Sequence, residues 1–130
     1  METTMMLLWI AVGGAFGAVA RYGLGGWVHS WAGTRFPWGT LVVNLVGSLL
    51  IGFLIRALEG SAVAPEMRAF LTIGLLGAFT TFSAYTFETV ELVRSGQPRL
   101  AALYSLGSLG LGIVAVYTGL VLAGLLLQRS

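Results

Sequence analysis

Four long apolar runs divide the sequence, and short polar segments separate them. A helix needs about 20 mostly apolar residues to cross the hydrocarbon core of a bilayer. The runs meet this requirement at approximately residues 5–28, 38–58, 69–93 and 100–127. The pattern predicts an all-α membrane protein whose four transmembrane helices form a single domain over residues 1–130.

The segments between the runs carry residues typical of turns and membrane boundaries. Residues 34–38, 59–66 and 95–99 hold charged side chains together with glycine, proline or serine. The tryptophans lie near the ends of the runs, as the aromatic belts of membrane helices do: Trp9, Trp27, Trp31 and Trp38. Because residues 1–4 carry no positive side chain and the first run is too long for a signal peptide, we interpret it as a membrane helix.

Composition supports the membrane class and excludes several others. Of the 130 residues, 57% are hydrophobic and 9% are charged, which is too little charge to cover a soluble domain of this length. Cysteine is absent, and a single histidine, His29, excludes a multi-histidine metal site within one chain. The net charge of +2 is small and dispersed, so we expect no nucleic-acid partner. The chain has no nucleophile–base arrangement of catalytic type, and we do not expect an enzyme.

Arginines in short loops normally decide which way a membrane protein inserts. With four spans, both termini and the second loop share one side of the membrane, which holds Arg56, Arg68 and Arg129. The other side holds an equal number: Arg35, Arg94 and Arg99. This balance favours dual topology, in which copies insert both ways and pair as an antiparallel homodimer. A fixed orientation set by other features is the alternative.

The first two spans each place a polar side chain in a row of small residues. In the first, Gly13, Gly17 and Arg21 share one helix face. Arg21 either finds a partner, such as a carboxylate, helix carbonyls or an anion, or extends to the membrane interface. The second span has an i+4 row of Thr40, Asn44, Ser48 and Gly52. Asn44 serves either as an interhelical hydrogen-bonding group or as a donor to an ion.

The third span contains the most unusual stretch, residues 77–88, where hydroxyls alternate with aromatic rings inside an apolar segment. A glycine followed by the β-branched pair Thr80 and Thr81 weakens helix continuity, so we expect the helix to break near its centre. A break frees backbone carbonyls that can coordinate a hard cation. The positive ring edge of Phe82 can face an anion, although such rings also suit ordinary packing.

The remaining polar groups lie in the last part of the chain. In the fourth span, Tyr104 and Ser108 are one helical turn apart and can extend a polar track, unless Ser108 bonds its own helix. Glu88 and Glu91 end the third span. We expect both carboxylates near the water boundary, where either can also serve as a proton-linked group.

Together these motifs resemble the Fluc (CrcB) family of fluoride channels. The resemblance rests on residues 13–22, 36–47 and 74–83 and on the small, hydroxyl-bearing fourth span, in the same order and spacing over nearly the whole chain. It implies a channel that passively exports fluoride across a bacterial inner membrane and so confers fluoride resistance. It also implies an inverted homodimer with a pair of pores and a central structural sodium ion.

The resemblance assigns roles to individual residues. The family's pore residues correspond to Asn44, Phe82, Ser83, Tyr85, Tyr104 and Ser108. Its vestibule arginine corresponds to Arg21, and the backbone carbonyls that hold sodium correspond to those of Gly77 and Thr80. The chain departs from the family at Tyr85, commonly phenylalanine, and at Ala84, commonly threonine. The added hydroxyl of Tyr85 can donate to an anion.

Two other classes fit parts of the pattern. A small multidrug-resistance-type, proton-coupled exporter is also a four-span, dual-topology dimer. It needs a membrane-embedded carboxylate in its first span, whereas here Glu2 precedes that span. A non-transporting assembly subunit would explain the glycines and Asn44 as packing groups, but not the motifs that occur together. A channel accounts for more of the sequence than either alternative.

Overall fold

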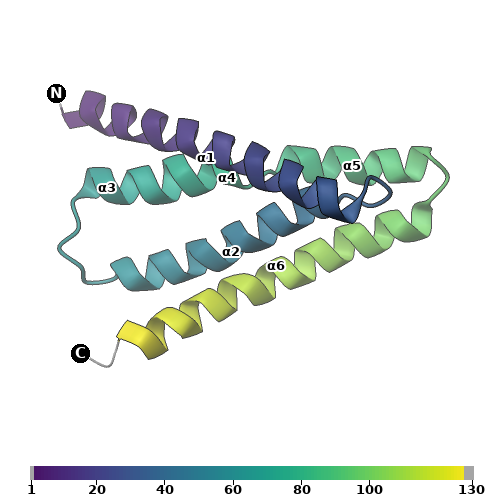
Figure 1. Ribbon diagram of the computed structural model, residues 1–130. Helices are drawn as coiled ribbons and strands as arrows, with labels where there is room; N and C mark the ends of the chain where they lie inside the picture. Colours follow the sequence, from purple (N-terminus) through teal and green to yellow (C-terminus); the bar gives the residue numbers. More distant parts are fainter. Residues whose placement is uncertain (1, 128–130) are drawn as a thin grey trace.

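The computed structural model describes residues 2–127, which are almost entirely helical (Figure 1). Helix α1 spans Glu2–Ala32, α2 Trp38–Leu58 and α6 Pro98–Leu127. The third span consists of α3 (Pro65–Ala69), η1 (Phe70–Leu76), α4 (Gly77–Phe79) and α5 (Phe82–Arg94). In this part of the chain, four helical segments are long and apolar enough to cross a membrane. The predicted all-α, multi-pass membrane architecture is therefore confirmed, and so is the break in the third span.

The helices extend past the predicted spans at several ends. The second span agrees at both ends, but α1 continues to Ala32 and α6 already begins at Pro98. Hydropathy marks only the part of a helix that suits hydrocarbon, and a helix can continue into the polar boundary. Proline favours the first position of a helix because its missing amide would have no partner there. This explains why the third and fourth spans begin at Pro65 and Pro98.

Glycines bring the helices close together. A Cβ atom on Gly52 of α2 would collide with the Val116 carbonyl oxygen of α6. On α1, a Cβ atom at Gly17 would likewise collide with the Leu75 carbonyl oxygen of η1. The face of α1 that carries Gly13 and Gly17 therefore packs against the third span, since such close backbone contact is how small residues hold membrane helices together.

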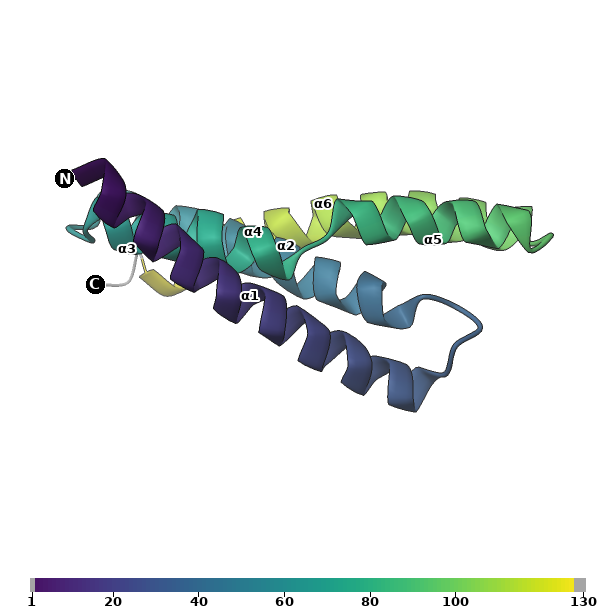
Figure 2. The same cartoon turned by 90° about the horizontal axis from the view of Figure 1, so that it is seen from above.

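The helices form an open bundle rather than a closed one. The start of α1, the end of α6 and the α2–α3 connection lie at one end, and the α1–α2 and α5–α6 connections lie at the other (Figure 1). Seen from above, α1 runs obliquely away from α5 and α6 (Figure 2). A small buried cluster of Leu41, Leu92, Ala101 and Tyr104 joins α2, α5 and α6. The break in the third span therefore lies where the helices begin to separate.

Candidate functional site

The third span leaves helical geometry at two consecutive residues. Thr80 (φ −83°, ψ 156°) and Thr81 (φ −146°, ψ 111°) are extended and separate α4 from α5. Thr81 is also the N-cap of α5, where its Oγ1 accepts the Ala84 amide at 3.2 Å. The β-branched pair thus forms the predicted break, and a side-chain cap restarts the helix after it.

Asn44 of α2 joins the broken backbone through both ends of its amide. Its Nδ2 donates to the Thr81 carbonyl at 3.0 Å, and its Oδ1 accepts the Thr81 amide at 2.7 Å. In hydrocarbon no water is available to satisfy such backbone groups, so these bonds make the break tolerable. One Nδ2 proton of Asn44 is left over, because a primary amide has two.

The break leaves the carbonyls of residues 77–80 without helical donors, and those of Gly77 and Thr80 are among them. A continuous helix would direct the Thr81 amide to Gly77 and the Ala84 amide to Thr80. Here the first donates to Asn44 and the second to the Thr81 hydroxyl. Both Gly77 and Thr80 line a cavity of about 320 Å³. Carbonyls of unwound membrane helices are ligands for Na⁺, so the donor set at this break fits the predicted sodium ion.

A groove opens beside the break between α2, α5 and α6. It consists of the 320 Å³ cavity and a second one of about 690 Å³, which share Asn44, Ser48, Phe82 and Tyr85. The Phe82 and Tyr85 ring centroids are 5.6 Å apart. Phe82 is 76% exposed, so its ring lies at the open side of the groove. The larger cavity is lined mainly by apolar side chains and also by Ser108 of α6.

The Ser108 hydroxyl is unusual within this groove. Its Oγ is buried and has no hydrogen-bond partner among the described residues. The hydroxyl of Tyr85, by contrast, donates to the Ser105 carbonyl at 2.9 Å. Burying a hydroxyl without a partner is unfavourable. Ser108 therefore marks a position where a ligand can replace the missing hydrogen bond.

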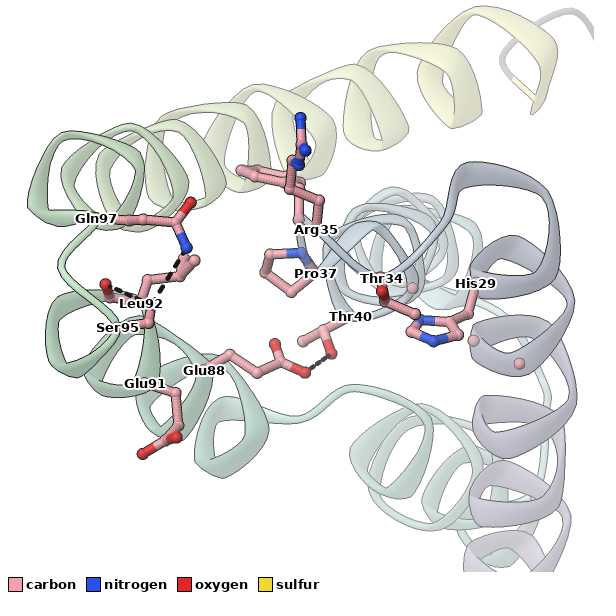
Figure 3. A pocket seen from close by; sticks show the side chains of 14 residues that line it. His29, Thr34, Arg35, Pro37, Thr40, Glu88, Glu91, Leu92, Ser95 and Gln97 are labelled. Carbon is pink, nitrogen blue, oxygen red and sulfur yellow. Dashed lines mark hydrogen bonds between the residues drawn. The ribbon is translucent and has the colours of Figure 1, made fainter.

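Glu88 links three helices at the end of the bundle that holds the α5–α6 turn. Its carboxylate accepts from the Thr40 hydroxyl and from the Tyr104 hydroxyl, each at 2.7 Å. Figure 3 shows the Thr40–Glu88 bond at the edge of a cavity of about 620 Å³, which is also lined by Arg35 and His29. Glu88 thus lies at the inner edge of an open mouth, and both of its carboxylate oxygens are bonded.

Arg21 lies outside the groove. It lines a cavity of about 260 Å³ together with Thr40, Thr81 and Ala84. Neither a hydrogen bond nor an ion pair joins its guanidinium to another of the residues that the structure describes. A partly buried cation without a partner attracts anions to its surroundings.

A family model described as "CrcB-like protein, Camphor Resistance (CrcB)" matches residues 8–120. This chain belongs to the CrcB family. The match includes the break, the groove and the mouth, so every part of the candidate site lies within the CrcB region. CrcB membership also confirms the predicted resemblance.

Several curated CrcB relatives are similar over almost their whole length, and all three described here are named "Fluoride-specific ion channel FluC". The relative from Thermus thermophilus is 49% identical over 120 residues, which cover 92% of this chain and 94% of the relative. The relative from Magnetococcus marinus is 46% identical over 123 residues, which cover 94% of this chain and 100% of the relative. The relative from Rhizobium meliloti is 45% identical over 117 residues, which cover 89% of this chain and 94% of the relative.

The structure of this CrcB protein brings together only part of the predicted site. Of the predicted pore residues, those that line the larger cavity are Asn44, Phe82, Tyr85 and Ser108. Three others lie outside the groove. Arg21 occupies the separate cavity described above, the Ser83 hydroxyl is 3.2 Å from the Thr81 hydroxyl, and Tyr104 is 1% exposed and bonded to Glu88.

Sequence analysis did not predict the contact of Thr40 and Tyr104 with Glu88. A weak signal was present, because Thr40 is one turn before Asn44 and Tyr104 is one turn before Ser108. Both hydroxyls therefore lie on the helix faces that carry the groove residues. The spacing indicated these faces but did not identify the carboxylate between them.

Proposed function

We propose that this chain is a fluoride-selective channel that passively exports fluoride across a bacterial inner membrane and so gives fluoride resistance. The names of relatives at 45% to 49% identity support this proposal. The observation that carries it is the buried, unpartnered hydroxyl of Ser108 in an apolar groove that also contains Asn44 and Phe82. Unused donors in an otherwise apolar passage suit a small anion.

Fluoride is small and strongly hydrated, so a pore must replace its water with close donors. In the groove, these would be the Ser108 hydroxyl and the second Nδ2 proton of Asn44. The positive edge of the Phe82 ring adds a weaker attraction. Ser83, which lies outside the groove and is exposed, would supply a further hydroxyl beside the break. A rigid constriction formed by the Phe82 and Tyr85 rings would favour the smaller halide.

The positive charge of Arg21 beside the break would raise the local concentration of the anion. Arg21 has no anionic partner in the described part of the chain, and its charge would attract fluoride toward the break. The sequence contains no motif that resembles a nucleotide-binding site. Passive flow down the fluoride gradient is therefore the mechanism we propose, rather than ATP-driven or proton-coupled export.

We also propose that the working unit is an antiparallel homodimer in the lipid bilayer, with a pair of pores. The equal arginine counts on the two sides support insertion in both orientations. The open side of the groove supports it as well, since the Phe82 ring is exposed there. A second copy against this face would close the groove and exclude lipid from the aromatic rings.

A structural sodium ion would complete the break. The carbonyls of Gly77 and Thr80 would hold it, because their helical donors are directed to Asn44 and to the Thr81 hydroxyl. Bound there, sodium would supply positive charge at the centre of the dimer. Asn44 binds the Thr81 backbone through two hydrogen bonds and so keeps these carbonyls in an unwound segment.

The test is passive efflux from liposomes that contain the purified protein. Fluoride and chloride electrodes would follow each ion after dissipation of the membrane potential. We expect fast fluoride release without chloride release. Equal release of both ions would contradict selectivity. No release from a folded protein would refute the channel and direct attention to drug-stimulated proton release, which a multidrug-type exporter would show.

A further inference from the structure

The hydroxyls that line the groove differ in whether the protein satisfies them. Those of four threonines donate to carbonyls of their own span: Thr72, Thr80, Thr86 and Thr89. The Thr81 hydroxyl accepts the Ala84 amide, and the Tyr85 hydroxyl donates to Ser105. Of the described groove residues, only Ser48 and Ser108 have hydroxyls without an internal hydrogen bond.

Ser48 differs from an ordinary helical serine. Such a serine usually donates to the carbonyl one turn before it on its own helix. Within the described residues, Ser48 makes no such bond, although the carbonyl of Asn44 is at the right spacing. Ser48 also lines both cavities of the groove, as Asn44 does. Its hydroxyl proton is therefore available to a ligand in the groove.

Gly112 of α6 keeps the space in front of Ser48 open. A Cβ atom on Gly112 would lie 3.8 Å from the Ser48 Oγ, so the hydroxyl is directed toward α6 at this point. Gly112 is one helical turn after Ser108 and lines the same cavity. The two unpartnered hydroxyls thus come from α2 and α6, and they lie about one helical turn apart along the groove.

We propose that Ser48 is a further anion-binding residue, which together with Ser108 forms a second fluoride position beside Gly112. This position lies one helical turn beyond Asn44, on the side away from the Glu88 mouth. It rests on the proposed fluoride-channel function and adds a donor from α2 that the family resemblance does not assign. Hydroxyl protons can rotate to face an anion, and the neighbours Ile113 and Val116 are apolar and offer no competing hydrogen-bonding side chain.

Two substitutions test this proposal, each with a matched control. Ser48→Ala removes the hydroxyl, and Gly112→Ala fills the space before it with a methyl group at an ordinary contact distance. The first control is Ser105→Ala, whose hydroxyl bonds the Ala102 carbonyl at 3.3 Å outside the groove. The second is Gly110→Ala, where a Cβ atom meets nothing within 4 Å.

We expect both test variants to release fluoride about tenfold more slowly than the parent, which corresponds to about 1.4 kcal/mol. The two controls should release it at the parent rate. Thermal melting of each variant, measured alongside, separates lost binding from lost folding. If Ser48→Ala does not fold, Gly112→Ala still tests the proposal, because it obstructs the proposed fluoride position without removing the Ser48 hydroxyl.

Parent-like fluoride efflux from Ser48→Ala or Gly112→Ala would overturn the proposal and leave Ser48 as a packing residue. A fall of the same size in a control variant would overturn it too, since the effect would then not depend on the groove. Absence of fluoride efflux from the parent protein is a different outcome, because it would refute the channel function itself.

Discussion

Replacement of Asn44 by aspartate is the most direct test of how the break and the groove work together. The change keeps an oxygen where the Thr81 amide donates at 2.7 Å. It converts the donor that faces the Thr81 carbonyl at 3.0 Å into a second oxygen. Asn44→Asp therefore loses one hydrogen bond, opposes two oxygen atoms and places a negative charge on the wall of the groove.

The two effects differ in size. A lost hydrogen bond between membrane helices costs about 1 kcal/mol. An anion that passes about 4 Å from the new carboxylate meets a repulsion of about 4 kcal/mol at an effective dielectric constant of about 20. Each 1.4 kcal/mol or so slows a rate about tenfold. We therefore expect fluoride efflux to fall about a thousandfold, while most of the folding stability is kept.

Fluoride efflux from liposomes measures the first effect, and thermal melting of the purified protein measures the second. Asn44→Ala is the matched control, because it loses the hydrogen bonds to Thr81 without adding a charge. Its efflux should fall far less than that of Asn44→Asp. Equal losses of fluoride efflux in the two variants would refute the electrostatic reasoning. Asn44 would then serve only to hold the Thr81 backbone at the break. Normal efflux from a folded Asn44→Asp protein would remove Asn44 from the pore altogether.

Three further predictions follow from the same geometry. Phe82→Ile removes the ring edge at the open side of the groove and should lower fluoride efflux about tenfold, a loss of about 1.4 kcal/mol; unchanged turnover would make Phe82 a packing residue. Tyr85→Phe should leave efflux unchanged and lower stability by about 1 kcal/mol in thermal melts, because its hydroxyl serves the Ser105 carbonyl; slower fluoride release would instead show that this hydroxyl contacts the anion. Replacing sodium by choline should promote dissociation of the proposed dimer in size-exclusion runs, and an unaffected dimer would argue against a cation at Gly77 and Thr80.

The helices and the break were predictable because both depend on local chemistry. Runs of apolar residues located the membrane spans, and the second span agrees at both ends, Trp38 and Leu58. The paired threonines Thr80 and Thr81 located the break, since β-branched residues near a glycine lower the local helix propensity. The prolines at 65 and 98 were visible too, and hydropathy alone placed the starts of these helices a few residues late.

The contacts across helices were not predictable from one sequence. Asn44 and Thr81 are 37 residues apart, and their contact depends on how α2 packs against the third span. Helical spacing identifies the face on which a side chain lies, but not the partner that this face meets. For the same reason the bond between Tyr104 and Glu88 was missed, although both residues were noted individually. The π-helical turn of η1 was also unpredicted, because it accompanies the close contact of Gly74 with α1.

The break and the groove carry opposite surpluses of hydrogen-bonding groups. At the break, Asn44 and the Thr81 hydroxyl accept the amides of Thr81 and Ala84, and the carbonyls left without helical donors include those of Gly77 and Thr80. A surplus of acceptors in hydrocarbon favours a cation. In the groove the surplus consists of hydrogen-bond donors without acceptors, the Ser108 hydroxyl and the second N–H of Asn44. This surplus favours an anion. Because Asn44 contributes to both, one side chain links the stability of the unwound segment to the passage beside it, and its replacement should affect the two in measurably different proportions.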